Sequence, residues 1–161
     1  MMDSEREATM KVKDVMSWQV VTIGPSDSCR DAVGRMHRAR VRHLPVINRD
    51  GLLVGMVTDR DLRHHLFSPR VFKTLGQTSV EGLLKAAPVA EVMTRLVISV
   101  PADAELSDAA QLMRTERIGS LPVVDGKHVV GIVTETDLLR HICQADAGCS
   151  PECTEIIVSY P

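Results

Sequence analysis

The feature of this sequence that most constrains its fold is an internal duplication. The stretch "KDVMSWQVVTIGPSDSCRDAVGRMHRARVRHLPVI" aligns, at a shift of 77 residues, with "AEVMTRLVISVPADAELSDAAQLMRTERIGSLPVV". Identical residues recur at this shift for Val15, Met16, Val20, Asp31, Ala32, Met36, Arg40, Leu44, Pro45 and Val46. At a shift of 76 they recur for Val54, Gly55, Val57, Thr58, Asp61 and Leu62. The chain therefore consists of two copies of one structural unit.

Each copy predicts the same order of elements, β-α-β-β-α. A short apolar strand (20–23 or 97–100) precedes a helix with apolar residues at helical spacing. Two strands joined by an Asp-Gly pair follow, as in a β-hairpin, and a closing helix begins near Asp59 or Glu135. One such unit is too small to form a stable hydrophobic core by itself. We therefore expect an α+β fold in which two repeats pack as a pseudo-twofold pair through their sheets.

The duplication also predicts the domain boundaries. We expect an N-terminal tail (1–10), a first repeat (11–66), a helical linker (67–87), a second repeat (88–144) and a C-terminal tail (145–161). Within the linker, a helix is expected around Ser79 to Ala86. Ser26 and Asp103 stand where the N-caps of the first helix of each repeat are expected.

Composition and charge exclude several classes of function. Aromatic residues make up only 2% of the chain, which counts against binding single-stranded nucleic acid by base stacking. The net charge of −2 argues against a general polyanion binder. The segment from Arg30 to Lys73 nevertheless carries ten Arg and Lys against four Asp, together with four histidines. Such a basic region in an acidic chain indicates a local anion site rather than a nucleic-acid coat.

No targeting, membrane or catalytic signal is found. No apolar run approaches the ~20 residues that cross a bilayer, and the charged N-terminus is unlike a secretion signal, so we expect a cytoplasmic protein. Cys143, Cys149 and Cys153 with His141 could form a metal site, but their spacing matches no standard zinc pattern and favours ordinary reduced cysteines. No catalytic constellation is present, so we expect a non-enzymatic protein with no required cofactor and no metal.

A Thr-x-x-Asp pattern at the start of the closing helix occurs in both copies, as Thr58 with Asp61 and as Thr134 with Asp137. One interpretation is a capping box, in which the two residues satisfy backbone N–H groups of the helix start. The other is a ligand site, in which the carboxylate accepts hydrogen bonds from the two ribose hydroxyls, as an acid does in dinucleotide-binding folds. Both can hold in one structure, because an empty site can cap its helix with the same groups.

Two complete copies with an "LPV" strand ("HLPVIN", "SLPVVD") and a "GhhTxxD" junction resemble a tandem pair of CBS domains, the cystathionine β-synthase type, known as a Bateman module. The resemblance covers residues 12–144. It implies a pseudo-twofold pair, usually dimerised into a flat disc. It also implies clefts that bind adenosine-containing ligands such as AMP, ADP, ATP or S-adenosylmethionine. Family members regulate enzymes, channels and transporters.

The resemblance also implies ligand-binding residues. Residues just before the Leu-Pro pair line the nucleotide cleft in the family, so Arg42 would hold a phosphate with His43 beside it, unless they form only a solvated basic edge. Their counterparts, Gly119 and Ser120, are uncharged, and Arg60 is replaced in the second copy by a threonine. The two sites are therefore expected to differ, with Arg42, His43 and Arg60 beside Asp61.

The remaining candidates lie on strands. Thr22 and Ser99 occupy matching positions on the first strand, which borders adenine and ribose in the family, although a plain strand-end hydroxyl explains them equally well. An apolar slot for the purine is expected from residues that also serve as core, namely Leu44, Pro45, Leu121 and Pro122.

Three functions are compatible with these features. The favoured one is a non-enzymatic sensor that binds adenosine-containing ligands, acts as a homodimer and is read by a regulated protein not identified by the sequence. The second is a dimerisation or interaction module whose clefts stay empty. The third and weakest is nucleic-acid binding through the basic segment.

Overall fold

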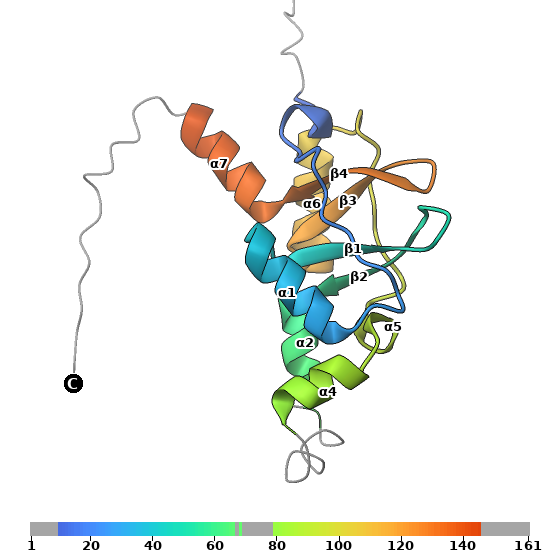
Figure 1. The fold of residues 1–161 in the computed structure, drawn as a ribbon. Helices are drawn as coiled ribbons and strands as arrows, with labels where there is room; N and C mark the ends of the chain where they lie inside the picture. Colours follow the sequence, from blue (N-terminus) through green and yellow to red (C-terminus); the bar gives the residue numbers. More distant parts are fainter. Residues whose placement is uncertain (1–9, 67, 69–78, 146–161) are drawn as a thin grey trace, which may run out of the picture.

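The structure is a computed structural model that describes residues 10–66, 68 and 79–145 (Figure 1). The first repeat contains η1 (Val12–Asp14), α1 (Cys29–Ala39), β1 (His43–Ile47), β2 (Leu53–Thr58) and α2 (Asp59–Leu66). The linker helix α4 (Val80–Ala86) follows. The second repeat contains α5 (Val89–Val92), α6 (Leu106–Glu116), β3 (Ser120–Asp125), β4 (His128–Thr134) and α7 (Glu135–Ala145). The expected linker helix, hairpins and closing helices are thus confirmed.

Each repeat contributes one antiparallel hairpin, and the two hairpins have the same register. His43 pairs with Thr58 in β1–β2, and Ser120 pairs with Thr134 in β3–β4. The turns use Gly51 and a matching glycine in the second repeat at positive φ, where glycine carries no steric penalty. The register places the start of the first strand beside the Thr-x-x-Asp junction in both repeats.

The first strand of each repeat is shorter than predicted. Only an isolated parallel bridge forms, between Ile23 and Val46 in the first repeat and between Val100 and Val123 in the second. In the first repeat the next donor of a parallel ladder would be Pro25, which lacks a backbone N–H, so the pairing cannot continue there.

The expected N-caps were also wrong. Ser28 caps α1, because its hydroxyl accepts from the N–H of Asp31 at 3.1 Å and Asp31 completes a capping box. Glu105 is the N-cap residue of α6 and makes no side-chain cap hydrogen bond. Asp103 instead forms an ion pair with Lys13 at 2.6 Å. The expected caps, Ser26 and Asp103, are the polar residues closest to the preceding prolines. The observed N-caps, Ser28 and Glu105, each lie two residues further along the chain.

The two repeats exchange short segments. Val12 and Met16, which belong to the first copy in sequence, are buried in the core of the second repeat. Val89 and Met93, which belong to the second copy, are buried in the core of the first. Backbone hydrogen bonds also connect each exchanged segment to the opposite repeat. Val12 N donates to Ala104 O at 2.9 Å, and Val89 N donates to Asp27 O at 2.8 Å in the reciprocal direction. Neither core is complete without a segment of the other copy.

Each exchanged methionine lies against a glycine of a central strand. A Cβ atom on Gly55 would be 2.5 Å from Sδ of Met93 and 3.1 Å from the carbonyl oxygen of Thr94. A Cβ on Gly131 would be 2.5 Å from Sδ of Met16. The absence of a side chain at these two positions lets the exchanged segments approach the strands.

The hairpins lie side by side and join at their turn ends (Figure 1). Leu53 N donates to Lys127 O at 2.9 Å, and Leu52 forms an antiparallel bridge with His128. The matching bridges and exchanged segments confirm an α+β fold of two repeats related by a pseudo-twofold axis. Among the described residues, no helix is long and apolar enough to cross a membrane.

The glycine contacts give a stability prediction. We expect Gly55→Ala to lower the free energy of unfolding by about 1–3 kcal/mol, because the new methyl group overlaps Met93 and backbone. Gly34→Ala is the control, since its Cβ in α1 meets only the end of Arg38, at 3.4 Å. The control should raise stability by about 0.5–1 kcal/mol. Urea unfolding measures both changes, and equal effects would contradict the close approach.

Candidate functional site

The two Thr-x-x-Asp patterns have the same local geometry. In the first repeat, Oδ2 of Asp61 accepts from Thr58 N at 2.9 Å and Thr58 Oγ1 at 2.7 Å, while Asp61 N donates back to Thr58 Oγ1. In the second, Oδ2 of Asp137 accepts from Thr134 N at 3.0 Å and Thr134 Oγ1 at 2.7 Å. The capping interpretation is confirmed for both helices. Each cap uses only one of the two carboxylate oxygens.

The second carboxylate oxygen distinguishes the two repeats. Oδ1 of Asp137 accepts from Nη1 of Arg140 at 3.0 Å, one turn along α7. The counterpart of Arg140 in α2 is His64, and Oδ1 of Asp61 has no hydrogen-bond partner among the described residues. Asp61 is therefore the carboxylate that can accept hydrogen bonds from a ligand without displacing an internal partner.

A cleft of about 510 Å³ contains Asp61 and is built from both repeats. We call it the Asp61 cleft. The first repeat supplies Arg42, His43, Met56, Thr58, Asp59, Arg60, Asp61 and Arg63. The second copy supplies Thr94, Leu96, Val97, Ile98, Arg117, Ile118, Gly119, Ser120, Pro122 and Glu135. Its size falls within the range of small-molecule sites.

A second cleft, of about 250 Å³, contains Asp137. We call it the Asp137 cleft. The first copy supplies Ser17, Gln19, Val20, Val21, Arg40, Val41, Arg42 and His43. The second supplies Gly119, Ile132, Thr134, Glu135, Thr136, Asp137 and Arg140. Its smaller volume leaves less room for a nucleotide than the Asp61 cleft offers.

The expected grouping of residues was therefore only partly correct. Arg42 and His43 lie beside Asp61, as expected, but they also line the Asp137 cleft. Gly119 likewise lines both clefts, and Ser120 lines the Asp61 cleft rather than the Asp137 cleft. Each carboxylate faces segments of the other repeat, an arrangement created by the pseudo-twofold axis and invisible in a linear alignment.

Most of the predicted site residues line one of the clefts. Those that do are Arg42, His43, Thr58, Arg60, Asp61, Gly119, Ser120, Pro122, Thr134 and Asp137. Those that line neither are Thr22, Leu44, Pro45, Ser99 and Leu121. Leu44, Pro45 and Leu121 are fully buried and serve as core. The neighbours of Thr22 and Ser99 line the clefts instead, since alternate residues of an extended segment face opposite sides.

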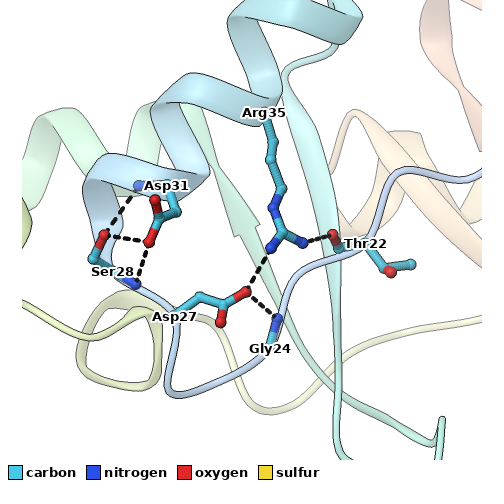
Figure 2. Close-up of polar contacts among 6 residues, drawn as sticks. All are labelled: Thr22, Gly24, Asp27, Ser28, Asp31 and Arg35. Carbon is cyan, nitrogen blue, oxygen red and sulfur yellow. Dashed lines mark hydrogen bonds and ion pairs between the residues drawn. The ribbon is translucent and has the colours of Figure 1, made fainter.

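The segment before Thr22, which lines the Asp137 cleft, is held by a polar network (Figure 2). Arg35 donates to the carbonyl oxygen of Thr22 at 2.6 Å and to Oδ2 of Asp27 at 2.9 Å. The same Asp27 oxygen accepts from Gly24 N at 3.1 Å. The counterparts of Arg35 and Asp27 are Leu112 and an alanine, which pack on the second core. This network is thus confined to the first repeat.

The clefts contain guanidinium groups without internal partners. Among the described residues, Arg42, Arg60 and Arg117 form no side-chain hydrogen bond or ion pair, and all three line the Asp61 cleft. Arg63 is paired with Asp59. Guanidinium groups bind phosphate or carboxylate oxygens with bidentate geometry. The Asp61 cleft therefore offers one free carboxylate oxygen and three free cationic groups.

His43 lies at the shared wall of the two clefts. Burial lowers the pKa of its imidazole, and the positive charge of Arg42 lowers it further. The carboxylates of Asp59, Glu135 and Asp61 oppose this change. A Cβ on Gly119 would lie 3.6 Å from Nε2 of His43 and 3.3 Å from Oε2 of Glu135. The glycine therefore keeps the space between the imidazole and that carboxylate open.

The cysteines and histidines do not form a metal site within the part of the chain that the structure describes. Cys143 is exposed, while Cys149 and Cys153 and the C-terminal tail lie outside the described residues. Cys29 is buried in the first core, and this burial raises its pKa to about 11. Its thiol stays protonated at neutral pH and is not a nucleophile.

The pKa of His43 predicts a pH dependence of stability. Because the folded-state pKa is lowered, the unfolded chain takes up this proton first as the pH falls. The contribution of neutral His43 to the free energy of unfolding is fully present above the pKa of the unfolded chain, about 6.5. It is lost as the pH falls through the lower pKa of the folded state. His43→Gln should therefore flatten the decline in unfolding free energy below about pH 6.5, measured by urea unfolding. The control is His37→Gln, an exposed residue outside both clefts; parallel curves for wild type and His43→Gln would refute the expectation.

Comparison with known proteins places this architecture in a family. The CBS domain pattern matches residues 12–68 and 89–144. The CBS domain-containing protein YhcV of Bacillus subtilis is 36% identical over 127 residues, which is 79% of this chain and 81% of YhcV. An uncharacterised protein of Methanocaldococcus jannaschii, MJ1404, is 34% identical over 139 residues. This match covers 86% of the present chain but only 33% of MJ1404.

Solved structures have the same fold as this chain. The CBS domain pair of protein MJ0100, in complex with 5′-methylthioadenosine and S-adenosyl-L-methionine, superposes with a TM-score of 0.69 at 30% identity, over 85% of this chain and 98% of that one. Protein MJ1225 from Methanocaldococcus jannaschii gives a TM-score of 0.77 at 31% identity, over 83% of this chain and 48% of that one. With both repeats matched in sequence and in structure, the chain belongs to the CBS domain family.

Proposed function

We propose that this chain is a non-enzymatic regulatory module that binds an adenosine-containing ligand in the Asp61 cleft. The observation that carries the proposal is the free Oδ1 of Asp61 in a cleft of about 510 Å³ that also holds three unpaired guanidinium groups. The MJ0100 domain pair, which has the same fold, was crystallised with two adenosine compounds. That precedent supports an adenosine ligand here.

The carboxylate of Asp61 would bind the ribose. A vicinal diol presents two O–H donors, and the free Oδ1 can accept from them while Oδ2 keeps the helix cap. The apolar side chains of Val97 and Ile98 line the same cleft. These groups supply the apolar surface that a purine base requires.

The charge of the cleft favours a phosphorylated ligand. Arg42, Arg60 and Arg117 are free to pair with phosphate oxygens, whereas the sulfonium of S-adenosylmethionine would be repelled by them. We therefore propose AMP, ADP or ATP rather than S-adenosylmethionine. The Asp137 cleft is the weaker site, because Arg140 already occupies Oδ1 of its carboxylate.

Ligand binding would regulate through the position of the repeats. Both repeats line the Asp61 cleft, so a ligand that binds better to one relative orientation shifts the population towards it. We propose that a partner protein reads this change in the cytoplasm. In keeping with such a role, this chain matches 24% of the length of the inosine-5′-monophosphate dehydrogenase of Methanocaldococcus jannaschii, at 30% identity.

Binding and mutation test the proposal together. We expect AMP at 100 times its dissociation constant to stabilise the fold by about 2.7 kcal/mol. Asp61→Ala should abolish this stabilisation, because the ribose acceptor is lost, and should itself lower stability by about 1 kcal/mol through loss of the cap. Thermal shift and isothermal titration calorimetry with AMP, ADP, ATP and S-adenosylmethionine measure both effects.

Asp137→Ala is a matched control, because it removes the same capping geometry from the other cleft. It should lower stability at least as much as Asp61→Ala, because it also removes the ion pair with Arg140, and it should retain binding in the Asp61 cleft. Wild-type protein that binds none of the four compounds would instead support an interaction module with empty clefts. If the protein retained labelled RNA or DNA on a filter, and this retention declined steeply with salt, the result would point to the nucleic-acid alternative.

We further propose a homodimer in which α7 contacts a second copy. Leu139 and Ile142 lie three residues apart on α7 and are 61% and 58% exposed. The equivalent helix α2 packs against α1, α4 and α5, whereas, among the described helices, α7 packs mainly against α6 and extends away from the hairpins (Figure 1). An apolar stripe on one helix suits a self-complementary contact about a twofold axis.

Replacement of this stripe tests the dimer. Wild-type protein should sediment as a dimer, and Leu139→Glu with Ile142→Glu should sediment as a monomer, because two carboxylates per copy would be buried in the interface. Val80→Glu, a change at an exposed apolar residue on α4, is the control and should stay dimeric. A wild-type monomer at micromolar concentration would disprove the contact.

A further inference from the structure

Two arginines hold an unusual backbone conformation at matching places in the fold. Arg40, the C-cap of α1, has φ 54° and ψ 40°, and Arg117, the C-cap of α6, has φ 55° and ψ 42°. These are the non-glycine residues with positive φ among those that the structure describes. Both repeats have therefore placed an arginine where the left-handed conformation disfavours any side chain with a Cβ.

The conformation alone does not require arginine. Glycine is the usual residue at a left-handed helix end, and asparagine is the usual alternative. Among the described residues, the other two positive-φ positions are glycines, Gly51 and Gly126 in the hairpin turns. Non-glycine residues in this region persist where the surroundings enforce them, and they concentrate at ligand sites.

The two arginines face the two clefts in a crossed arrangement. Arg117, from the second repeat, lines the cleft that contains Asp61 of the first. Arg40, from the first repeat, lines the cleft that contains Asp137 of the second. The end of each first helix thus delivers a guanidinium to the carboxylate cleft of the opposite repeat.

Neither guanidinium has an internal partner. Among the described residues, Arg40 and Arg117 form no side-chain hydrogen bond or ion pair, and both side chains are exposed. Two other arginines that line the clefts are already engaged, Arg63 with Asp59 and Arg140 with Asp137, whereas Arg42 and Arg60 are unpaired like Arg117. An unpaired guanidinium on a strained backbone position has all its donors available for an external anion.

We infer that Arg117 is an anion-binding residue of the Asp61 cleft and that Arg40 has the same role in the Asp137 cleft. This inference rests on the proposed function, since the anion is the phosphate of the adenosine ligand. Arg117 would bind phosphate oxygens from the second repeat while Asp61 binds ribose from the first. One ligand would then connect the two repeats through groups of opposite charge.

A second role must be separated from this one. A cation at a helix C-terminus also interacts favourably with the helix dipole. That role predicts an effect on folding stability without any effect on ligand choice. Anion binding predicts the reverse, a selective loss of affinity for ligands that carry phosphate.

The experiment compares AMP with adenosine, which lacks only the phosphate. Arg117→Gly and Arg117→Asn both fit the left-handed conformation, so both variants should fold at least as stably as wild type. Titration calorimetry should show that AMP affinity falls about tenfold or more in both, as expected for loss of a charged hydrogen-bonding partner. Adenosine affinity should stay within about twofold of wild type.

Two control variants make the result specific. Arg114→Ala removes a positive charge from the same end of α6, but Arg114 bonds Gln111 and lines neither cleft, so it should leave AMP affinity unchanged. Arg38→Ala removes an exposed positive charge from the last turn of α1, and because Arg38 lines neither cleft, this variant should also leave AMP affinity unchanged. Equal losses for AMP and adenosine, or no loss in the Arg117 variants, would overturn the inference while the proposed function stands. Failure of wild-type protein to bind AMP would overturn both.

Discussion

The exchange of the Val-Met segments is the constraint on which the rest of this structure depends. Met16 completes the core of the second repeat and Met93 completes that of the first, each against a strand glycine that leaves no room for a Cβ. The repeats are therefore joined by interlocked cores as well as by the hydrogen bonds between their hairpin turns. This connection brings residues of both repeats together in common clefts.

The crossed clefts combine charges that no single repeat could bring together. Each carboxylate comes from the start of a closing helix, and the facing arginine comes from the end of the first helix of the opposite repeat. The symmetry is broken by a few substitutions. His64 in place of Arg140 leaves Asp61 with a free oxygen, and Gly119 in place of Arg42 leaves space beside His43. Duplication supplied two sites, and sequence divergence made them unequal.

Much of the fold was predictable because the duplication repeats every local signal. The hairpin turns, the closing helices and the Thr-x-x-Asp caps are local features that depend on neighbouring residues, and all were found as predicted. The predictions failed where a longer-range contact decides. Asp103 pairs with Lys13 rather than capping a helix, and the first strands stop at one bridge.

The sequence by itself determined the two repeats, their order of elements and the carboxylates at the helix starts, because these follow from spacing along the chain. It could not show that Arg42 and His43 line both clefts, that Thr22 lines neither cleft while its carbonyl oxygen accepts from Arg35, or that Arg117 lies with Asp61. Only the tertiary structure decided these pairings, because the pseudo-twofold axis brings together residues that are far apart in sequence. The left-handed conformation of Arg40 and Arg117 is likewise set by how each helix end turns into its strand.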